Sequence, residues 1–130
     1  MRNLRINQLS ASAFDWYRRY MTLYDLGDIE RLRAYVSADC TFQINNNVPI
    51  HGADAMALVM HRLHTRYRRI EREVVNIYGS DLNFASEMLW HYTRLDDSRV
   101  TVPAAHFIDR GGDGLIVSIH VYADTAPVYT

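Results

Sequence analysis

The spacing of apolar residues changes near the middle of the chain, from a helical period to a strand period. In the stretch SASAFDWYRRYMTLYDLGD, residues 10–28, apolar side chains recur at the spacing of one face of an α-helix. Ser10 or Ser12 can cap the start of this helix, and Gly27 can end it. A long first helix is therefore expected.

The other expected elements follow from the same two patterns. Asp28 can cap a short helix over IERLRAYV, CTFQINN is a strand candidate, and an apolar stripe predicts a third helix over residues 53–68. Alternating side chains predict four strands in the second half, over approximately residues 70–78, 83–95, 99–109 and 115–124. Short turns join these strands, so neighbours along the chain should pair antiparallel.

Two histidines are expected on one face of the resulting sheet. If the turn between the second and third of those four strands is Asp97-Ser98, His91 lies opposite Ala104, with His106 as its diagonal neighbour. At roughly 7 to 8 Å between α-carbons, both imidazoles could reach one small ligand. This face is otherwise small and aliphatic, which leaves room for a cavity under the helices.

The opposite face of the sheet is expected to be bulky and aromatic. It would carry Trp90, Tyr92 and Phe107, and about three helices are too few to cover both faces. A large exposed apolar patch usually marks an interface. The chain is therefore predicted to form a homodimer through this aromatic face.

Composition and charge restrict the class of protein. The 130 residues are 48% hydrophobic and 22% charged, which suits one globular domain over residues 1–130. A formal net charge of −1 gives no overall field that would attract nucleic acid or an anionic membrane. The single cysteine, Cys40, allows no internal disulfide, and neither a signal peptide nor a membrane span is recognisable. The expected location is the cytoplasm.

Two weaker signals concern metal ions and carboxylates. His61 and His64 have the helical spacing of metal ligands, but no third ligand follows in a compatible pattern, so no metal is expected. Glu71 and Glu73 open a strand and could place one carboxylate at the mouth of the pocket.

Four stretches carry a resemblance to a known family: RRYMTLYDLGDIERLRAYVSADCTF, VPIHG before the third helix, DGLIVSIHVYAD as the last strand, and TAPVY after it. They resemble the nuclear transport factor two-like superfamily, in particular its SnoaL-like enzymes. The resemblance runs from about Ala11 to Tyr129. It implies an α+β, cone-shaped fold in which about three N-terminal helices pack on a bent, mostly antiparallel sheet that encloses a pocket. This fold hosts isomerases, dehydratases, cyclases, epoxide hydrolases and non-enzymes.

The resemblance also implies roles for single residues. Similarity to ketosteroid-isomerase-like members places their oxyanion-hole tyrosine at Tyr20 and their second oxyanion donor at His106. Their general-base aspartate falls near Ile44 or Asn45, where this chain has no carboxylate.

Two further family patterns fall on residues that lack the required side chains. The catalytic aspartate of SnoaL-type cyclases falls on Val121. The arginine and aspartate that epoxide hydrolases carry on one strand fall on Leu89 and His91.

Dehydratases that resemble scytalone dehydratase or the bile-acid dehydratases suggest the remaining chemistry. They use a tyrosine and an aspartate from the first helix and a histidine on the sheet, which implies Tyr20, Asp25, His91 and His106 as catalytic residues. His91 would remove a proton beside a carbonyl, with Asp25 holding its tautomer. Tyr20 and His106 would stabilise the enolate or protonate a leaving hydroxyl.

The predicted function is that of a cofactor-free acid/base enzyme: an isomerase, dehydratase or cyclase. Its substrate would be a small hydrophobic carbonyl or hydroxyl compound of polyketide, terpenoid or steroid type. The residues expected to bind it are Trp16, Tyr24, Ile44, Leu89, Ala104, Ile119 and Val121. The alternative is a non-catalytic small-molecule-binding or dimerisation module of the same fold, whose histidines are hydrogen-bonded core residues.

Overall fold

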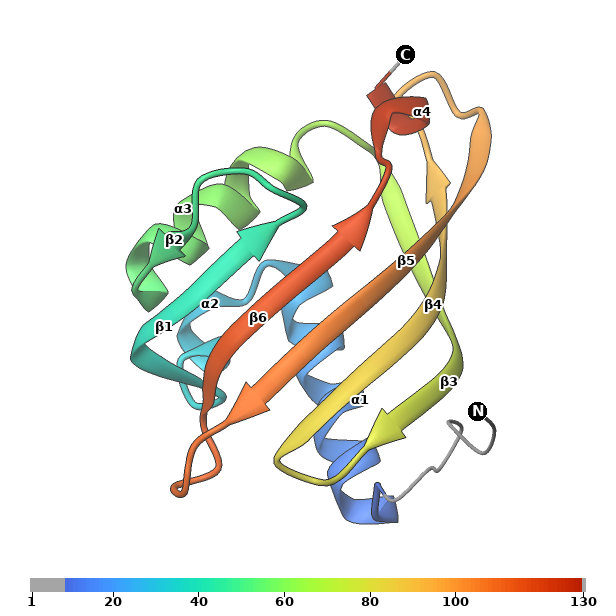
Figure 1. Ribbon diagram of the computed structural model, residues 1–130. Helices are drawn as coiled ribbons and strands as arrows, with labels where there is room; N and C mark the ends of the chain where they lie inside the picture. Colours follow the sequence, from blue (N-terminus) through green and yellow to red (C-terminus); the bar gives the residue numbers. More distant parts are fainter. Residues whose placement is uncertain (1–8, 130) are drawn as a thin grey trace.

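The computed structural model describes residues 9–129, and its elements follow one another as labelled in Figure 1. The helices are α1 (Ala11–Leu26), α2 (Ile29–Leu32), α3 (Ala53–His64) and α4 (Ala126–Tyr129). The strands are β1 (Val36–Ile44), β2 (Ile50–His51), β3 (Arg69–Gly79), β4 (Asn83–Thr93), β5 (Arg99–Arg110) and β6 (Ile116–Ala123).

The first helix begins and ends where its capping residues require. The Ser10 hydroxyl accepts a hydrogen bond of 3.1 Å from the backbone N–H of Ala13. Gly27 has a left-handed φ of 68°, and its N–H donates to the carbonyls of Leu23 and Tyr24. These bounds confirm the long first helix that the sequence predicts.

The other helices differ from the expected lengths. α2 is a single turn capped by Asp28, and α3 ends at His64, short of the expected residue 68. No periodicity predicts α4, because four residues are too few to display one. Within residues 9–129, no helix has the length and apolarity needed to cross a membrane.

Six strands form one mixed sheet in the order β2-β1-β6-β5-β4-β3. β1 runs parallel to β6, and every other neighbouring pair is antiparallel. The sheet is bent, and α1 and α3 lie on its concave side (Figure 1). This arrangement confirms the α+β, cone-shaped fold with N-terminal helices packed on a mostly antiparallel sheet.

The connection between β4 and β5 corrects one prediction. Thr93 pairs with Arg99, so residues 94–98 form a five-residue loop where a two-residue turn was expected. His91 consequently lies opposite Thr101, three positions from its expected partner. Because side chains alternate along a strand, an odd shift in register exchanges its two faces.

The exchange affects β4 alone. Its inner face, under the helices, carries Met88, Trp90 and Tyr92, which are all buried, whereas Leu89 and His91 face outwards. The neighbouring strands keep the expected orientation. Their buried inner residues include Ala104, His106, Ile108, Ile119 and Val121.

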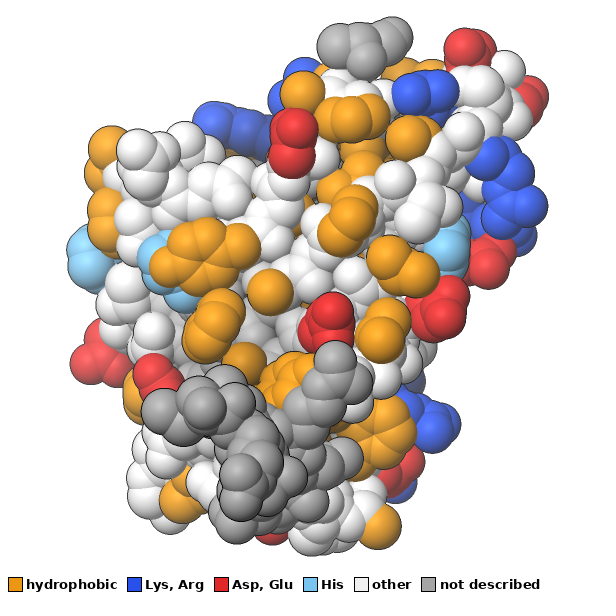
Figure 2. Space-filling model, turned by 45° about the vertical axis from the view of Figure 1, so that its right-hand side comes forward, with side chains coloured by type: hydrophobic (Ala, Val, Ile, Leu, Met, Phe, Trp, Pro, Cys, Tyr) orange, Lys and Arg blue, Asp and Glu red, His pale blue; other side chains and the backbone are white. Residues whose placement is uncertain are grey.

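The outer face of the sheet is therefore less aromatic than expected. Trp90 and Tyr92 are buried inside, and Phe107, 50% exposed, packs edge-to-face on Tyr122 with 5.6 Å between ring centroids. Figure 2 shows hydrophobic side chains scattered over the middle of its view and charged ones gathered along the right-hand edge. We still propose a homodimer through the outer face, now supported by Phe107 and Tyr122. A monomeric mass in sedimentation at micromolar concentration would contradict it.

Candidate functional site

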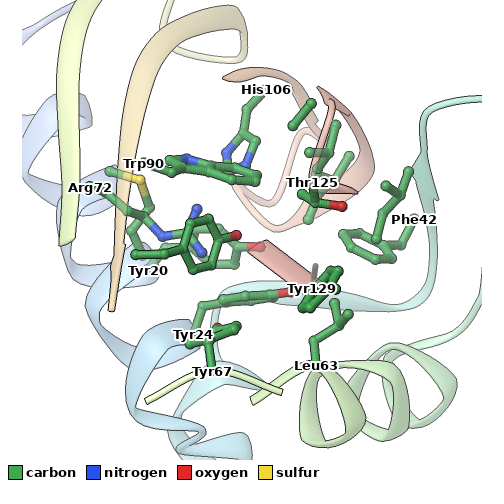
Figure 3. A pocket seen from close by; sticks show the side chains of 16 residues that line it. Tyr20, Tyr24, Phe42, Leu63, Tyr67, Arg72, Trp90, His106, Thr125 and Tyr129 are labelled. Carbon is green, nitrogen blue, oxygen red and sulfur yellow. The ribbon is translucent and has the colours of Figure 1, made fainter. Parts of the chain in front are cut away.

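An internal pocket lies between the concave side of the sheet and the helices α1 and α3. Its cavity volume is about 60 Å³. In Figure 3, Arg72 and Trp90 lie on one side of it, with Phe42 and Thr125 on the other. Its aromatic lining residues include Tyr20, Tyr24, Tyr67, Trp90, Tyr92 and Tyr129. Such a wall suits a small, largely apolar compound.

A buried ion pair stands at the wall of this pocket. Arg72, from β3, has a side chain that is 7% exposed, and Asp25, from the last turn of α1, is 22% exposed. The Nε of Arg72 donates to both carboxylate oxygens of Asp25 at 2.9 Å, and Nη2 lies 2.9 Å from Oδ1. Burial alone would lower the pKa of Arg72, but the Asp25 carboxylate outweighs burial and raises it. The guanidinium therefore stays charged, and Asp25 balances that charge.

Two N–H donors beside the pocket are left without a partner. Nη1 of Arg72 and Nε1 of Trp90 are buried, and neither has a hydrogen-bond partner among the described residues. The guanidinium carbon of Arg72 lies 4.7 Å from the centroid of the Trp90 ring. A buried donor without an acceptor costs about 1–3 kcal/mol. A ligand oxygen that accepted a hydrogen bond from Arg72 would remove that penalty.

His106 faces the pocket from β5. Its side chain is 6% exposed, and its Nδ1 lies 2.9 Å from the hydroxyl of the fully buried Tyr17. Burial, and to a lesser extent the charge of Arg72, holds the pKa of His106 well below the usual histidine range. The imidazole is therefore neutral near physiological pH, where it can accept a proton.

The contact with Tyr17 permits either tautomer of His106. If the Tyr17 hydroxyl donates to Nδ1, Nε2 carries the proton and acts as a donor. If Nδ1–H donates to the Tyr17 oxygen, that hydroxyl can donate to Sδ of Met88, 3.9 Å away, and Nε2 has a free lone pair. Among residues 9–129, no other group hydrogen-bonds to His106. The same imidazole can thus take up a proton or give one.

Tyrosine hydroxyls add neutral donors to the pocket. Tyr20 is 2% exposed, and its hydroxyl has no hydrogen-bond partner within the described part of the chain. Burial raises the pKa of Tyr20 well above its usual value and that of Tyr24 to about 12. Both hydroxyls therefore keep their protons near physiological pH and can donate to a ligand oxygen.

The last turn of the chain completes the wall. Thr125 and Tyr129 line the pocket. The Nε of Arg94 donates to the carbonyl of Pro127 at 3.0 Å, and the guanidinium of Arg66 lies 3.9 Å over the Tyr129 ring. These contacts hold α4 against the pocket.

Most residues that the sequence predicts for the site lie at this pocket. The wall contains Tyr20, Tyr24, Ile44, His106, Ile119 and Val121. Ala104 is buried on the same face of the sheet. Asp25 does not itself line the pocket, and its carboxylate accepts a hydrogen bond from the lining residue Arg72 where a histidine was expected. Their roles in binding or catalysis stay predictions.

The remaining predicted residues lie elsewhere. His91 and Leu89 face outwards because of the register of β4, so the expected position of His91 in the pocket is wrong. Nδ1 of His91 lies 2.8 Å from the Thr101 hydroxyl, and Nε2 lies 2.9 Å from Oε1 of Glu73. Trp16 lies outside the lining, with the Arg110 guanidinium 3.7 Å over its ring.

Arg72 is the residue that reasoning from the sequence missed. In RIEREVV, Arg72 alternates with Glu71 and Glu73 and shares a face with Ile70 and Val74. A single arginine on an apolar strand face needs a buried partner, so this pattern was the available signal. Glu71 and Glu73 lie on the outer face, not at the pocket mouth, because they pair with outward-facing residues of β4.

Comparison of the sequence with known families gives one clear match. The model of the SnoaL-like domain matches residues 17–119. That range runs from α1 into β6 and includes the ion pair and His106. Among curated proteins, none matches the sequence significantly.

Comparison with solved structures identifies the same fold. A nuclear transport factor two-like protein of unknown function from Burkholderia pseudomallei K96243 superposes with a TM-score of 0.79 at 14% identity, covering 93% of this chain and 99% of its own. A candidate SnoaL-like polyketide cyclase from Shewanella denitrificans OS-217 gives a TM-score of 0.77 at 10% identity, with coverages of 88% and 92%. SalBIII is an epoxide hydrolase/cyclase-like enzyme in pyran ring formation of the polyether salinomycin. It superposes with a TM-score of 0.73 at 14% identity, covering 87% of this chain and 91% of its own.

Proposed function

We propose that this chain, which belongs to the SnoaL-like domain family, is a cofactor-free acid/base enzyme that moves a proton beside the carbonyl of a small hydrophobic compound. One observation carries the proposal: Arg72, whose Nη1 is a buried donor without a partner among the described residues, lines the same pocket as the neutral imidazole of His106. The ring of Trp90 contacts both, with 4.7 Å to Arg72 and 5.5 Å between the Trp90 and His106 centroids.

The two groups are suited to opposite ends of one reaction step. The substrate carbonyl would accept a hydrogen bond from Nη1 of Arg72, and Nε2 of His106 would remove a proton from the adjacent carbon. The C–H electron pair then forms a carbon–carbon double bond, and the carbonyl oxygen becomes an enolate oxygen. The Nη1 hydrogen bond stabilises that developing charge, and because the proton passes to His106, the imidazolium balances the enolate and the net charge of the site does not change. The Tyr20 hydroxyl would be a second donor.

The imidazolium formed in this step determines the outcome. Returning the proton to another carbon gives isomerisation, and giving it to a leaving hydroxyl gives dehydration. The same acid/base pair could support ring closure, and the similar fold of SalBIII serves pyran ring formation. A pocket with aromatic and aliphatic walls favours a hydrophobic substrate, as expected for compounds of polyketide, terpenoid or steroid type.

Deuterium uptake from D₂O into the α-carbon of a small ketone tests this proposal. 2-Tetralone is a suitable probe because its α-protons are acidic and it has only two rings. The wild-type protein should accelerate the uptake, and His106→Ala should abolish the acceleration while staying folded, since the base is gone. A loss on the order of 10²-fold or more is expected for a positioned general base.

The matched control removes the histidine on the other face of the sheet. His91→Ala should leave the uptake unchanged, because His91 lies outside the pocket. Uptake that survives in His106→Ala, or that falls equally in His91→Ala, would overturn the proposed mechanism. Ketone binding without any uptake would support the alternative of a non-catalytic binding module.

A further inference from the structure

We propose that the Asp25–Arg72 ion pair makes the pocket selective for uncharged carbonyl compounds and rejects carboxylates of the same shape. Asp25 would then be a specificity-determining residue rather than a catalytic one. This inference rests on the proposed function in one respect: both require that a ligand oxygen bind at Arg72.

The donors of Arg72 are divided between Asp25 and the pocket. Asp25 occupies the edge formed by Nε and Nη2 through three contacts of 2.9 Å. Nη1 has no partner among the described residues, and Figure 3 shows the guanidinium pointing towards the middle of the lining side chains. Arg72 therefore keeps hydrogen-bonding capacity towards a ligand after its charge has been balanced.

The rest of the lining brings no charge that could change this balance. Its polar groups are neutral hydroxyls such as those of Tyr20, Tyr24 and Thr125, together with the His106 imidazole. Arg72 is the only Lys, Arg, Asp or Glu among the described residues that line the pocket. With Asp25 directly behind it, the site has a formal charge of zero before a ligand enters.

The two classes of ligand differ in what they add to that site. A ketone or amide oxygen accepts the Nη1 hydrogen bond and leaves the local charge at zero. A carboxylate makes the same bond, but it places a second anion next to a guanidinium that is already paired with Asp25. Both side chains of that pair have low solvent exposure. Repulsion between anions a few ångströms apart in such surroundings corresponds to a tenfold or larger loss of affinity, on the order expected for a weakly screened pair.

The end of helix α1 determines where the Asp25 carboxylate lies. It lies in the last turn of α1, two residues before Gly27, whose left-handed φ of 68° ends the helix. A Cβ on residue 27 would meet Nδ1 of His64 at 3.4 Å, so the chain turns close to α3 at this point. The carboxylate is thus placed against Arg72 by the end of the helix.

The test compares two probes with nine non-hydrogen atoms each, acetophenone and benzoate, by NMR titration of the full chain. Wild-type protein should bind acetophenone at least about tenfold more tightly than benzoate. Asp25→Asn keeps the shape of the side chain but leaves Arg72 with an unbalanced charge, so the preference should reverse by a similar factor. Glu73→Gln removes one carboxylate from the outer face and should leave the wild-type preference unchanged.

Several outcomes would overturn the inference. The wild-type protein could bind benzoate as tightly as acetophenone, or neither probe could bind measurably. The Asp25→Asn variant could also keep the wild-type ratio of acetophenone affinity to benzoate affinity. If Asp25→Asn fails to fold, the affinities of the wild-type protein for benzamide and benzoate still test the inference. Benzamide is a neutral ligand of the same shape as benzoate, so equal affinities would overturn the inference. Deuterium uptake is a separate readout: selectivity without uptake defeats the proposed enzyme alone, and uptake without selectivity defeats this inference alone.

Discussion

His106 and His91 lie on adjacent strands but on opposite faces of the sheet, and their surroundings differ in almost every respect. His106 is 6% exposed and contacts the buried hydroxyl of Tyr17. His91 has a side chain that is 28% exposed, and it lies between Glu73 and Thr101 at the surface. The inner imidazole adjoins a pocket, whereas the outer one joins a solvated polar network.

The difference shows that register, rather than residue type, decides which histidine faces the pocket. Burial lowers the pKa of His106 and strengthens its interaction with neighbouring charges. Around His91, water screens the contact with Glu73, and a surface pair of this kind contributes little. The following three predictions compare the two faces directly.

The largest difference is expected between the ion pairs of the two faces. Arg72→Met should lower the free energy of unfolding by about 3 kcal/mol, because Asp25 is left as a poorly solvated carboxylate without its partner. Glu73→Gln should cost less than about 1 kcal/mol, because its contact with His91 is exposed to water. Urea denaturation of both variants measures these costs, and similar values for the two would contradict the comparison.

A smaller difference is expected in the dependence of stability on pH. Burial lowers the pKa of His106 in the folded protein, so below about pH 6.5 the unfolded chain takes up a proton that the folded chain does not. The free energy of unfolding should therefore fall as the pH falls, by up to about 1.4 kcal/mol per pH unit from this residue.

Substituting His106 isolates that contribution. His106→Gln should give a smaller slope of stability against pH than the wild type between about pH 6.5 and 5. Chemical denaturation at several pH values measures both slopes. Equal slopes in wild type and His106→Gln would show that His106 is not held neutral by its surroundings.

The smallest effect is expected from removing the outer imidazole altogether. His91→Ala should change the free energy of unfolding by less than about 1 kcal/mol, because water can replace its contacts with Thr101 and Glu73. Thermal denaturation followed by circular dichroism is sufficient to measure this. A cost similar to that of Arg72→Met would mean that the outer network supports the sheet.

The fold could be predicted from the sequence wherever a pattern extends over many residues. The long first helix, its Gly27 end and the strands of the second half follow from periodicity over ten or so residues. The loop over residues 94–98 could not, because the turn motif at Asp97-Ser98 is local and says little about where pairing begins. Pairing of Thr93 with Arg99 gives a five-residue loop, and this register exchanges the inner and outer faces of β4.

The candidate site could be predicted where residues follow the family pattern and not where this chain departs from it. Tyr20 was reached through the resemblance, His106 through the alternation of its strand as well as the resemblance, and both line the pocket. Asp25 was expected to hold an imidazole, but it holds Arg72, a residue 47 positions away in the sequence. Long-range pairs of this kind depend on how α1 crosses the sheet, which no local pattern specifies.

The position of Trp90 has a practical consequence for spectroscopy. The chain has two tryptophans, and Trp16, outside the pocket, lies under the Arg110 guanidinium at 3.7 Å. Trp90 lines the pocket beside a guanidinium and an imidazole, so a compound that entered would change the surroundings of its ring and alter its emission. Trp16→Phe would leave Trp90 as the single tryptophan, and pocket occupancy could then be followed by tryptophan fluorescence in unlabelled protein.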